Sequence, residues 1–110
     1  MGIDCRGLFV CEDPSVSSGL APITVDDNGE NQIVIIGGAN DELTKEEIMS
    51  LDSEGNVLGP NGAKWLVVQL ELPVELSIEG MKIAKKNGMQ VLVNTAPGRP
   101  ISELNGDIFK

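Results

Sequence analysis

Apolar residues along the chain fall into short runs that polar, turn-forming stretches separate. Residues 8–11 (Leu-Phe-Val-Cys) form a run long enough for one strand, and a polar stretch over 12–15 ends it. Residues 20–25 and 32–36 are two further runs, and Asn28-Gly29 lies between them. Asn-Gly is the preferred pair for a tight hairpin turn, because both central residues must take positive φ. The pattern predicts one strand followed by a β-hairpin.

The predicted hairpin is apolar on both faces of its second strand. Ile33 and Ile35 lie on one face, whereas Val34 and Ile36 lie on the other. Pro22 removes a backbone donor from the first strand, so that strand is expected to be an edge strand or to carry a bulge. Such a hairpin needs cover on two faces, and we expect it to be a surface for self-association.

A short helix and a loop are predicted after the hairpin. Thr44 and Glu47 have the spacing of a capping box, with Thr44 as the N-cap residue. The glycine- and proline-rich residues 51–64 allow little regular structure. We expect a loop there that holds at most one helical turn.

The second half of the chain has the pattern of a β-α-β unit. Residues 65–70 and 89–93 are continuous apolar runs, which are typical of parallel strands buried on both faces. Between them Pro73 occupies a first helical position, and Asn87-Gly88 provides the stop. The crossover between the strands is expected to be right-handed. The inner stripe of the helix is predicted at Val74, Ile78, Met81 and Ala84.

Two polar residues follow the predicted parallel strands. Glu71 comes after the first strand and Asn94 after the second. In an open parallel sheet, ligands bind just beyond the carboxyl ends of the strands, so this edge is a candidate site. A structural interpretation stays open beside it, in which Glu71 supports the start of the helix and Asn94 forms a turn.

The charge and the composition exclude several classes of function. A formal net charge of −9 argues against binding to nucleic acid or to anionic membranes. The sequence contains no histidine, which excludes a Ser-His-Asp triad. Cys5 and Cys11 are too few for a zinc site and are expected to be free thiols. Neither a secretory leader nor a membrane-spanning stretch is recognisable, so we expect a cytoplasmic protein.

Two loops resemble ligand-binding motifs but lack the required spacing. Residues 37–40 (Gly-Gly-Ala-Asn) do not have the spacing of a P-loop or its Lys-Ser/Thr pair, so a turn is expected. The acidic residues at 26–30 do not match the offsets of a calcium loop, and we expect a solvated hairpin tip.

Motifs in a fixed order nevertheless resemble one known family, the ribokinases. Residues 18–25 with Gly29-Glu30-Asn31 and Gly38-Ala39-Asn40 resemble the ribokinase lid region. Further along, Gln69-Leu70-Glu71-Leu72-Pro73 and Asn94-Thr95-Ala96-Pro97 resemble the family segments Q-L-E-x-P and N-P-A-P. The resemblance covers nearly the whole chain and is weakest over 52–64.

The resemblance implies an α/β fold, in particular a partial ribokinase-like fold with a β-hairpin lid segment and a β-α-β unit of a parallel sheet. Residues 1–18 would be a strand and linker of the α/β domain. Residues 19–37 would be the lid hairpin, and 38–110 would be part of the core domain. The family's lid commonly makes a homodimer interface, which implies a homodimer through the hairpin.

The activity that the resemblance implies is transfer of the ATP γ-phosphate to the 5-hydroxyl of D-ribose, assisted by Mg²⁺ and a monovalent cation such as K⁺. Ala21 and Ile23 would be lid residues near the sugar. Glu71 would be the strand-end glutamate of the substrate pocket, where it accepts hydrogen bonds from sugar hydroxyls or orders water around magnesium, and Asn94 would line the same edge. No catalytic, nucleotide-binding or metal-binding residue is assigned to this chain.

The printed sequence lacks the family's Gly-Gly-Lys, Asn-x-x-Glu and Gly-Ala-Gly-Asp motifs. Because these carry sugar binding, metal association and the catalytic base, we expect the isolated chain to be inactive. It is either a fragment of a ribokinase or a truncated paralogue that acts as a non-catalytic partner through its hairpin. An unrelated small α/β binding protein is a third interpretation. The choice between ribose and a related pentose or nucleoside stays open.

Overall fold

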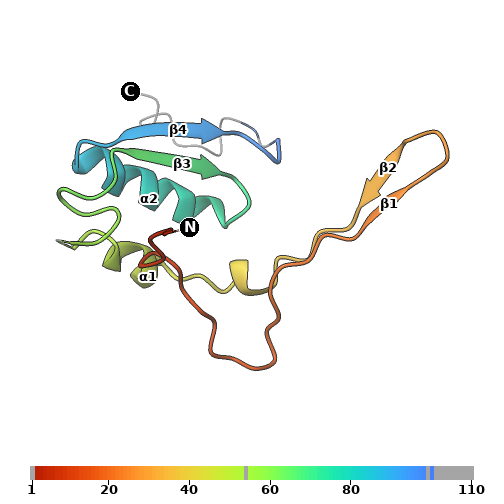
Figure 1. Ribbon diagram of the computed structural model, residues 1–110, viewed down its shortest axis with the longest axis horizontal. Helices are drawn as coiled ribbons and strands as arrows, with labels where there is room; N and C mark the ends of the chain where they lie inside the picture. Colours follow the sequence, from red (N-terminus) through yellow and green to blue (C-terminus); the bar gives the residue numbers. More distant parts are fainter. Residues whose placement is uncertain (1, 54, 99, 101–110) are drawn as a thin grey trace. The chain divides into compact units, whose positions relative to one another are not determined.

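The computed structural model describes residues 2–53, 55–98 and 100, which form two compact units (Figure 1). One unit contains the described residues of Met1–Phe9 and Leu43–Lys110, and the other is Val10–Glu42. The fold is a small α/β arrangement with an antiparallel hairpin and a parallel β-α-β unit, as the sequence predicts. The elements in chain order are β1 (Ile23–Val25), β2 (Asn31–Ile33), the 3-10 helix η1 (Gly38–Asn40), α1 (Lys45–Ser50), β3 (Trp65–Gln69), α2 (Val74–Lys86) and β4 (Gln90–Asn94).

The hairpin is formed by β1 and β2, but its turn differs from the predicted one. Gly29 has a φ of 84°, whereas Asn28 does not have a positive φ, so the expected turn with two positive φ values is wrong. Instead the Asp26 side chain accepts hydrogen bonds from the backbone N–H groups of Asn28 and Glu30, both at 2.9 Å. These hydrogen bonds form an Asx turn, which needs a positive φ at Gly29 only.

Regular pairing stops at Ile23, so both strands of the hairpin are shorter than predicted. Pro22 has no N–H to donate, although its carbonyl still accepts from the Val34 N–H at 3.1 Å. Beyond it a single bridge joins Leu20 to Ile36. The ladder is thus interrupted at Pro22, and β1 is an edge strand of a two-stranded sheet among the described residues, as predicted.

The strand predicted over residues 8–11 is wrong, because these residues have no regular secondary structure. The Leu8 N–H donates to the Cys5 carbonyl at 3.0 Å, which closes a turn. Phe9 alone of this run packs against the core. A four-residue apolar run cannot by itself show whether a pairing strand exists beside it.

Helix α1 begins with the predicted capping box. The Thr44 hydroxyl accepts from the Glu47 N–H at 3.2 Å, and the Glu47 carboxylate accepts from the Thr44 N–H at 2.8 Å. These two bonds satisfy backbone donors that a helix of only six residues would otherwise expose. The loop expected over 51–64 is also confirmed among its described residues, which form turns.

Strands β3 and β4 pair in parallel, with helix α2 as the crossover between them. Their register runs from Trp65 opposite Gln90 to Gln69 opposite Asn94. Pro73, predicted as the first helical residue, is instead the N-cap residue of α2, which begins one position later at Val74. Asn87 caps the other end, and Gly88 follows with a φ of 76°, as expected of a helix stop.

The core lies between α1, α2 and the inner face of the β3–β4 sheet. Of the predicted inner stripe, Val74, Met81 and Ala84 are buried and Ile78 is half-buried. The opposite face of the sheet exposes Trp65, Val67 and Leu92. The prediction that both strands are buried on two faces is therefore wrong for the described residues, because α2 covers one face only. The main cluster of buried residues contains Ile48, Leu51, Leu58, Leu76, Ile83, Ala84 and Met89.

Candidate functional site at the carboxyl edge of the sheet

The carboxyl ends of β3 and β4 meet at one edge of the sheet. Gln69 lies opposite Asn94, and just beyond this pair the Leu70 N–H donates to the Ala96 carbonyl at 2.9 Å. Asn94 is the last residue of β4, and Glu71 lies two residues after β3. The structure therefore brings Glu71 and Asn94 to the same edge, as the strand pattern predicts.

A buried residue fixes the chain where Glu71 leaves the sheet. Leu70 is fully buried and packs with Val74 and Ile78, so Glu71 is left at the surface. Glu71 does not cap helix α2, because no side chain accepts a hydrogen bond at its N-cap and Glu75 is the acidic residue of the first turn. The helix-start role considered for Glu71 therefore has little geometric support.

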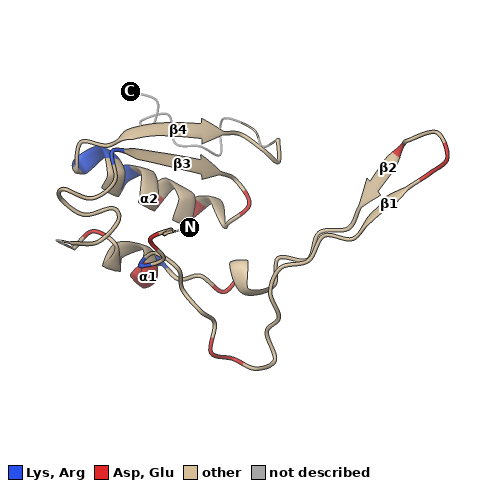
Figure 2. Cartoon of the chain, viewed as in Figure 1, with Lys and Arg blue, Asp and Glu red and all other residues tan. Residues whose placement is uncertain are grey.

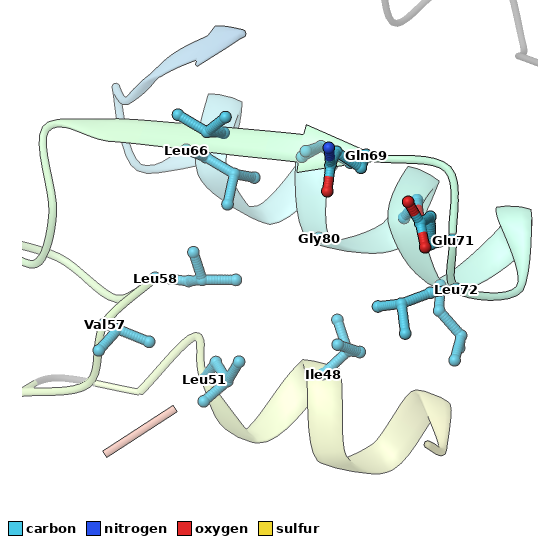
Figure 3. Close-up of a pocket in the computed structure, with 13 residues that line it drawn as sticks. Ile48, Leu51, Val57, Leu58, Leu66, Gln69, Glu71, Leu72 and Gly80 are labelled. Carbon is cyan, nitrogen blue, oxygen red and sulfur yellow. The ribbon is translucent and has the colours of Figure 1, made fainter. Parts of the chain in front are cut away.

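An apolar pocket of about 390 Å³ lies between α1 and β3 (Figure 3). Ile48, Leu51 and Leu58 point into it from α1 and the following loop, and Glu71 and Gln69 lie toward one end. Sequence reasoning missed this pocket. Its available signal was the set of apolar residues in α1 and in the glycine-rich loop, which had to pack against something.

The other two predicted site residues, Ala21 and Ile23, lie on the hairpin, in the second compact unit. Both are exposed, and Ile23 pairs with Ile33 across the hairpin. The structure thus places the four predicted residues as two pairs, one on each unit.

The distribution of charge does not make the carboxyl edge a phosphate site. Lys85 and Lys86 occupy the last turn of α2, at the opposite end of the unit from Glu71 (Figure 2). Arg6 is paired with Asp4 at 2.6 Å, and this contact lowers the pKa of the Asp4 carboxyl to about 2. Residues that could hold the ATP phosphates are therefore not gathered at this edge in the part of the chain that the structure describes.

The residues present do not fit a magnesium or potassium site either. Within residues 2–53, 55–98 and 100, no three histidine, cysteine or acidic side chains come together as ligands. In the acidic hairpin loop, the Asp26 carboxylate already accepts hydrogen bonds from the backbone N–H groups of Glu30 and Asn28, which lower its pKa. Cys5 and Cys11 are free thiols, as predicted.

No helix among the described residues is long and apolar enough to span a membrane.

These features define a small α/β piece in which a hairpin precedes a parallel β-α-β unit. No family model matches the chain. Ribokinase of Dictyostelium discoideum is 35% identical to it over 96 residues, which are 86% of this chain and 28% of the relative. Deoxyribokinase of Salmonella typhi is 39% identical over 89 residues, which are 81% of this chain and 28% of the relative. The solved structure of ribokinase from Giardia lamblia matches with a TM-score of 0.62 and 27% identity, over 77% of this chain and 27% of that chain.

The chain therefore belongs to the ribokinase family, of which it corresponds to one segment. It spans less than a third of the length of each of these relatives.

Proposed function

We propose that this chain supplies the lid hairpin and the carboxyl-edge sugar contacts of an ATP-dependent pentose kinase that phosphorylates D-ribose at its 5-hydroxyl. Residues 19–37 form the lid, whereas 1–18 and 38–110 belong to the α/β domain. The observation that carries the proposal is the meeting of Glu71 and Asn94 at the carboxyl ends of two parallel strands. The similarity to proteins named ribokinase and deoxyribokinase supports it.

The side chains at this edge suit a sugar. A carboxylate such as Glu71 accepts hydrogen bonds from hydroxyl groups, and the Asn94 amide can both donate and accept. The proposal also assigns Ala21 and Ile23 of the hairpin as lid residues near the sugar. The proposed substrate is ribose, and a deoxyribose is the competing one because a relative carries that name.

The remaining parts of the reaction come from outside this chain. ATP, Mg²⁺ and a monovalent cation act in the complete kinase, which we propose is cytoplasmic and a homodimer through the hairpin. The isolated chain is expected to show no sugar-dependent turnover of ATP, because general base and anion stabilisation are needed for phosphoryl transfer.

A chimera tests the function of the carboxyl edge. The full chain replaces the 96 matched residues of the Dictyostelium ribokinase, and ribose kinase activity is measured. Glu71→Gln keeps the shape and removes the charge, so kcat/KM for ribose is expected to fall at least about tenfold, which is about 1.4 kcal/mol. Glu75→Gln, an exposed acid of the same region, is the matched control and leaves kcat/KM unchanged.

The melting temperature separates a functional role for Glu71 from a structural one. If the proposed function is correct, Glu71→Gln leaves the melting temperature nearly unchanged, since Glu71 is exposed and gives no side-chain hydrogen bond at the N-cap of α2. An unchanged kcat/KM together with a lower melting temperature would assign Glu71 to the structure and remove it from the site.

A second candidate function is that of a non-catalytic partner of a complete kinase. The observation that favours it is the exposed apolar surface of the hairpin, which is suited to pairing with another lid. An inactive chimera, combined with binding of the isolated chain to an intact relative, would favour this second function.

A further inference from the structure

Asn-Gly pairs occur four times in the sequence, and three of them lie in the described residues: Asn28-Gly29, Asn61-Gly62 and Asn87-Gly88. The fourth, Asn105-Gly106, lies outside the described residues. Asparagine before glycine can lose its side-chain ammonia, because glycine has no Cβ to hinder attack of its backbone nitrogen on that side chain. Since the three described pairs share this chemistry, a large difference in their reactivity has to come from the structure around them.

The Asn87-Gly88 pair is protected at its asparagine. The Asn87 amide donates to the Asp52 carboxylate and to the Leu58 carbonyl, both at 2.7 Å. Asn87 is also half-buried. These two bonds fix the side-chain carbon that would be attacked, so they have to break before the pair can react.

The Asn61-Gly62 pair is protected at its glycine. A Cβ on Gly62 would meet three backbone carbonyl oxygens, those of Val57, Asn56 and Gly59, at 2.6, 2.7 and 2.9 Å. The Gly62 N–H also donates to the Gly59 carbonyl at 2.9 Å. Because Gly62 is packed so closely against its own loop, its nitrogen cannot approach the Asn61 side chain unless the loop opens.

The Asn28-Gly29 pair has neither form of protection. Both residues are exposed in the loop that joins β1 to β2 (Figure 1). Beyond the two chain neighbours, no atom of the described residues lies within 4 Å of the position that a Cβ on Gly29 would take. The Asn28 amide makes one long hydrogen bond, at 3.5 Å, to the Asp26 carboxylate. The bond from the Gly29 N–H to the Asp26 carbonyl, at 3.1 Å, has to break, but strands of three residues hold this loop weakly.

We propose that Asn28 is a site of spontaneous deamidation and that its isoaspartate product opens the turn of the hairpin. The Gly29 nitrogen forms a bond to Cγ of Asn28, the bond from Cγ to Nδ2 breaks, and the backbone proton leaves with Nδ2 as ammonia. Water then opens the resulting five-membered imide to aspartate or to isoaspartate, each of which adds one negative charge. The reaction needs only this chain and water, so it does not depend on the proposed kinase function.

Isoaspartate disturbs the turn more than aspartate does, because its backbone runs through the side-chain carbon and gains one methylene. The Asp26 carboxylate accepts from the backbone N–H groups of Asn28 and Glu30, which lie on either side of that insertion. The Asp26 N–H donates in turn to the Glu30 carbonyl at 2.9 Å. A longer backbone between these groups is expected to break the bonds that reach Glu30.

The rates at the individual pairs test the proposed site. The full 110-residue chain is incubated in mildly alkaline buffer, and tandem mass spectrometry of its peptides locates each increase in mass of about 1 Da. Asn28 is expected to react at least about tenfold faster than Asn61 and Asn87, and faster as the pH rises because the attacking nitrogen must lose its proton. In urea, where the chain is unfolded, the three rates are expected to agree within about threefold. Equal rates in the folded chain, or a faster reaction at Asn61 or Asn87, overturn the proposal.

Two variants assign the released ammonia to one residue. Asn28→Ala is expected to remove the fast phase of ammonia release. Asn61→Gly is the matched control: it removes another Asn-Gly pair, accepts the positive φ of 62° at that position, and leaves the fast phase unchanged. A fast phase that persists in Asn28→Ala would show that the reaction occurs elsewhere in the chain and overturn the assignment.

The two products separate the added charge from the altered backbone. Aspartate and isoaspartate at position 28 carry the same charge, so the purified aspartate product is the control for the isoaspartate product. In the isoaspartate product, the amides of Asp26 and Glu30 are expected to exchange with solvent at least about tenfold faster than in the aspartate product. Equal exchange in the two products would contradict the proposed opening of the turn.

Discussion

Asp52 and Asn87 connect the glycine-rich loop after α1 to the end of α2. The Asp52 carboxylate accepts from the Lys86 ammonium at 2.6 Å and from the Asn87 amide at 2.7 Å. The same amide donates to the Leu58 carbonyl at 2.7 Å. Leu58 is a buried member of the core, so this small set of hydrogen bonds holds one wall of the pocket in place.

Removal of the Asn87 side chain tests this connection. Asn87→Ala loses two hydrogen bonds in a partly buried place and is expected to lower the free energy of unfolding by about 1 kcal/mol. Urea denaturation of the isolated chain measures the change. Asn28→Ala, at the exposed tip of the hairpin, is the control and is expected to stay within about 0.5 kcal/mol of the wild type. Equal losses in the two variants would contradict the role of Asn87.

The pH dependence of stability has a sign that follows from Asp52. The hydrogen bond from Lys86, and next the one from Asn87, lower the pKa of Asp52 below its ordinary value of 3.8. A lowered pKa in the folded state means that this contribution is complete above pH 3.8 and is lost as the pH falls through the folded pKa. Asn87→Ala removes one cause of the shift, so its stability should fall less steeply with acid.

At the scale of elements, the hairpin exposes the largest set of apolar side chains. Ile35 is 69% exposed, and Ile33, Val34 and Ile36 beside it are about half exposed. A surface of this kind is stable in water mainly when another surface covers it. The proposed homodimer through the lid would provide that cover.

A charge in the middle of this surface tests the homodimer. Ile35→Lys is expected to weaken self-association at least about tenfold, because an ammonium group would be buried without a partner. Val10→Lys is the matched control, since Val10 is 77% exposed and lies outside the hairpin. Sedimentation equilibrium over a range of concentrations measures both. A wild-type chain that stays monomeric at high concentration would remove the support for the lid dimer.

The elements that could be predicted are those with a local physical cause. The capping box at Thr44 and Glu47 starts α1, and the pair Asn87-Gly88 ends α2, because each depends on neighbours in the chain. The strand over 8–11 and the two-residue turn at Asn28-Gly29 failed. A strand over 8–11 would need a second strand to pair with, which a local pattern cannot show. The two-residue turn does not form because the Asp26 side chain accepts hydrogen bonds that stabilise a different turn.

At the scale of the whole molecule, the edge that carries Glu71 and Asn94 could be predicted from the sequence, whereas the pocket beside β3 could not. Glu71 and Asn94 could be predicted to lie together, since parallel strands end at one edge whatever surrounds them. The pocket beside β3 could not, because it arises where α1 and the glycine-rich loop pack against β3. Packing between distant segments leaves no fixed spacing in the sequence.

One face of the β3–β4 sheet is apolar but exposed, which indicates that another layer of structure covers it in the complete fold. The runs at β3 and β4 have the composition of strands covered on both faces, yet Trp65, Val67 and Leu92 are exposed. Trp65 is 61% exposed, and covering it would remove on the order of 100 Å² of apolar surface, worth about 2–3 kcal/mol. The open face is therefore expected to be covered when the rest of an α/β kinase surrounds this segment.

Trp65 reports that change directly, because it is the only tryptophan of the chain. In the isolated chain its fluorescence is expected to be red-shifted and readily quenched by acrylamide, a neutral quencher that the net charge of −9 does not repel. In the Dictyostelium chimera, the spectrum of Trp65 is obtained by subtracting that of the Trp65→Phe variant, which keeps an aromatic ring in place. That difference spectrum is expected to be blue-shifted and weakly quenched, since the added layer excludes water from the face. Equal quenching in the isolated chain and the chimera would show that this face stays open, and the apolar composition of β3 would then need another explanation.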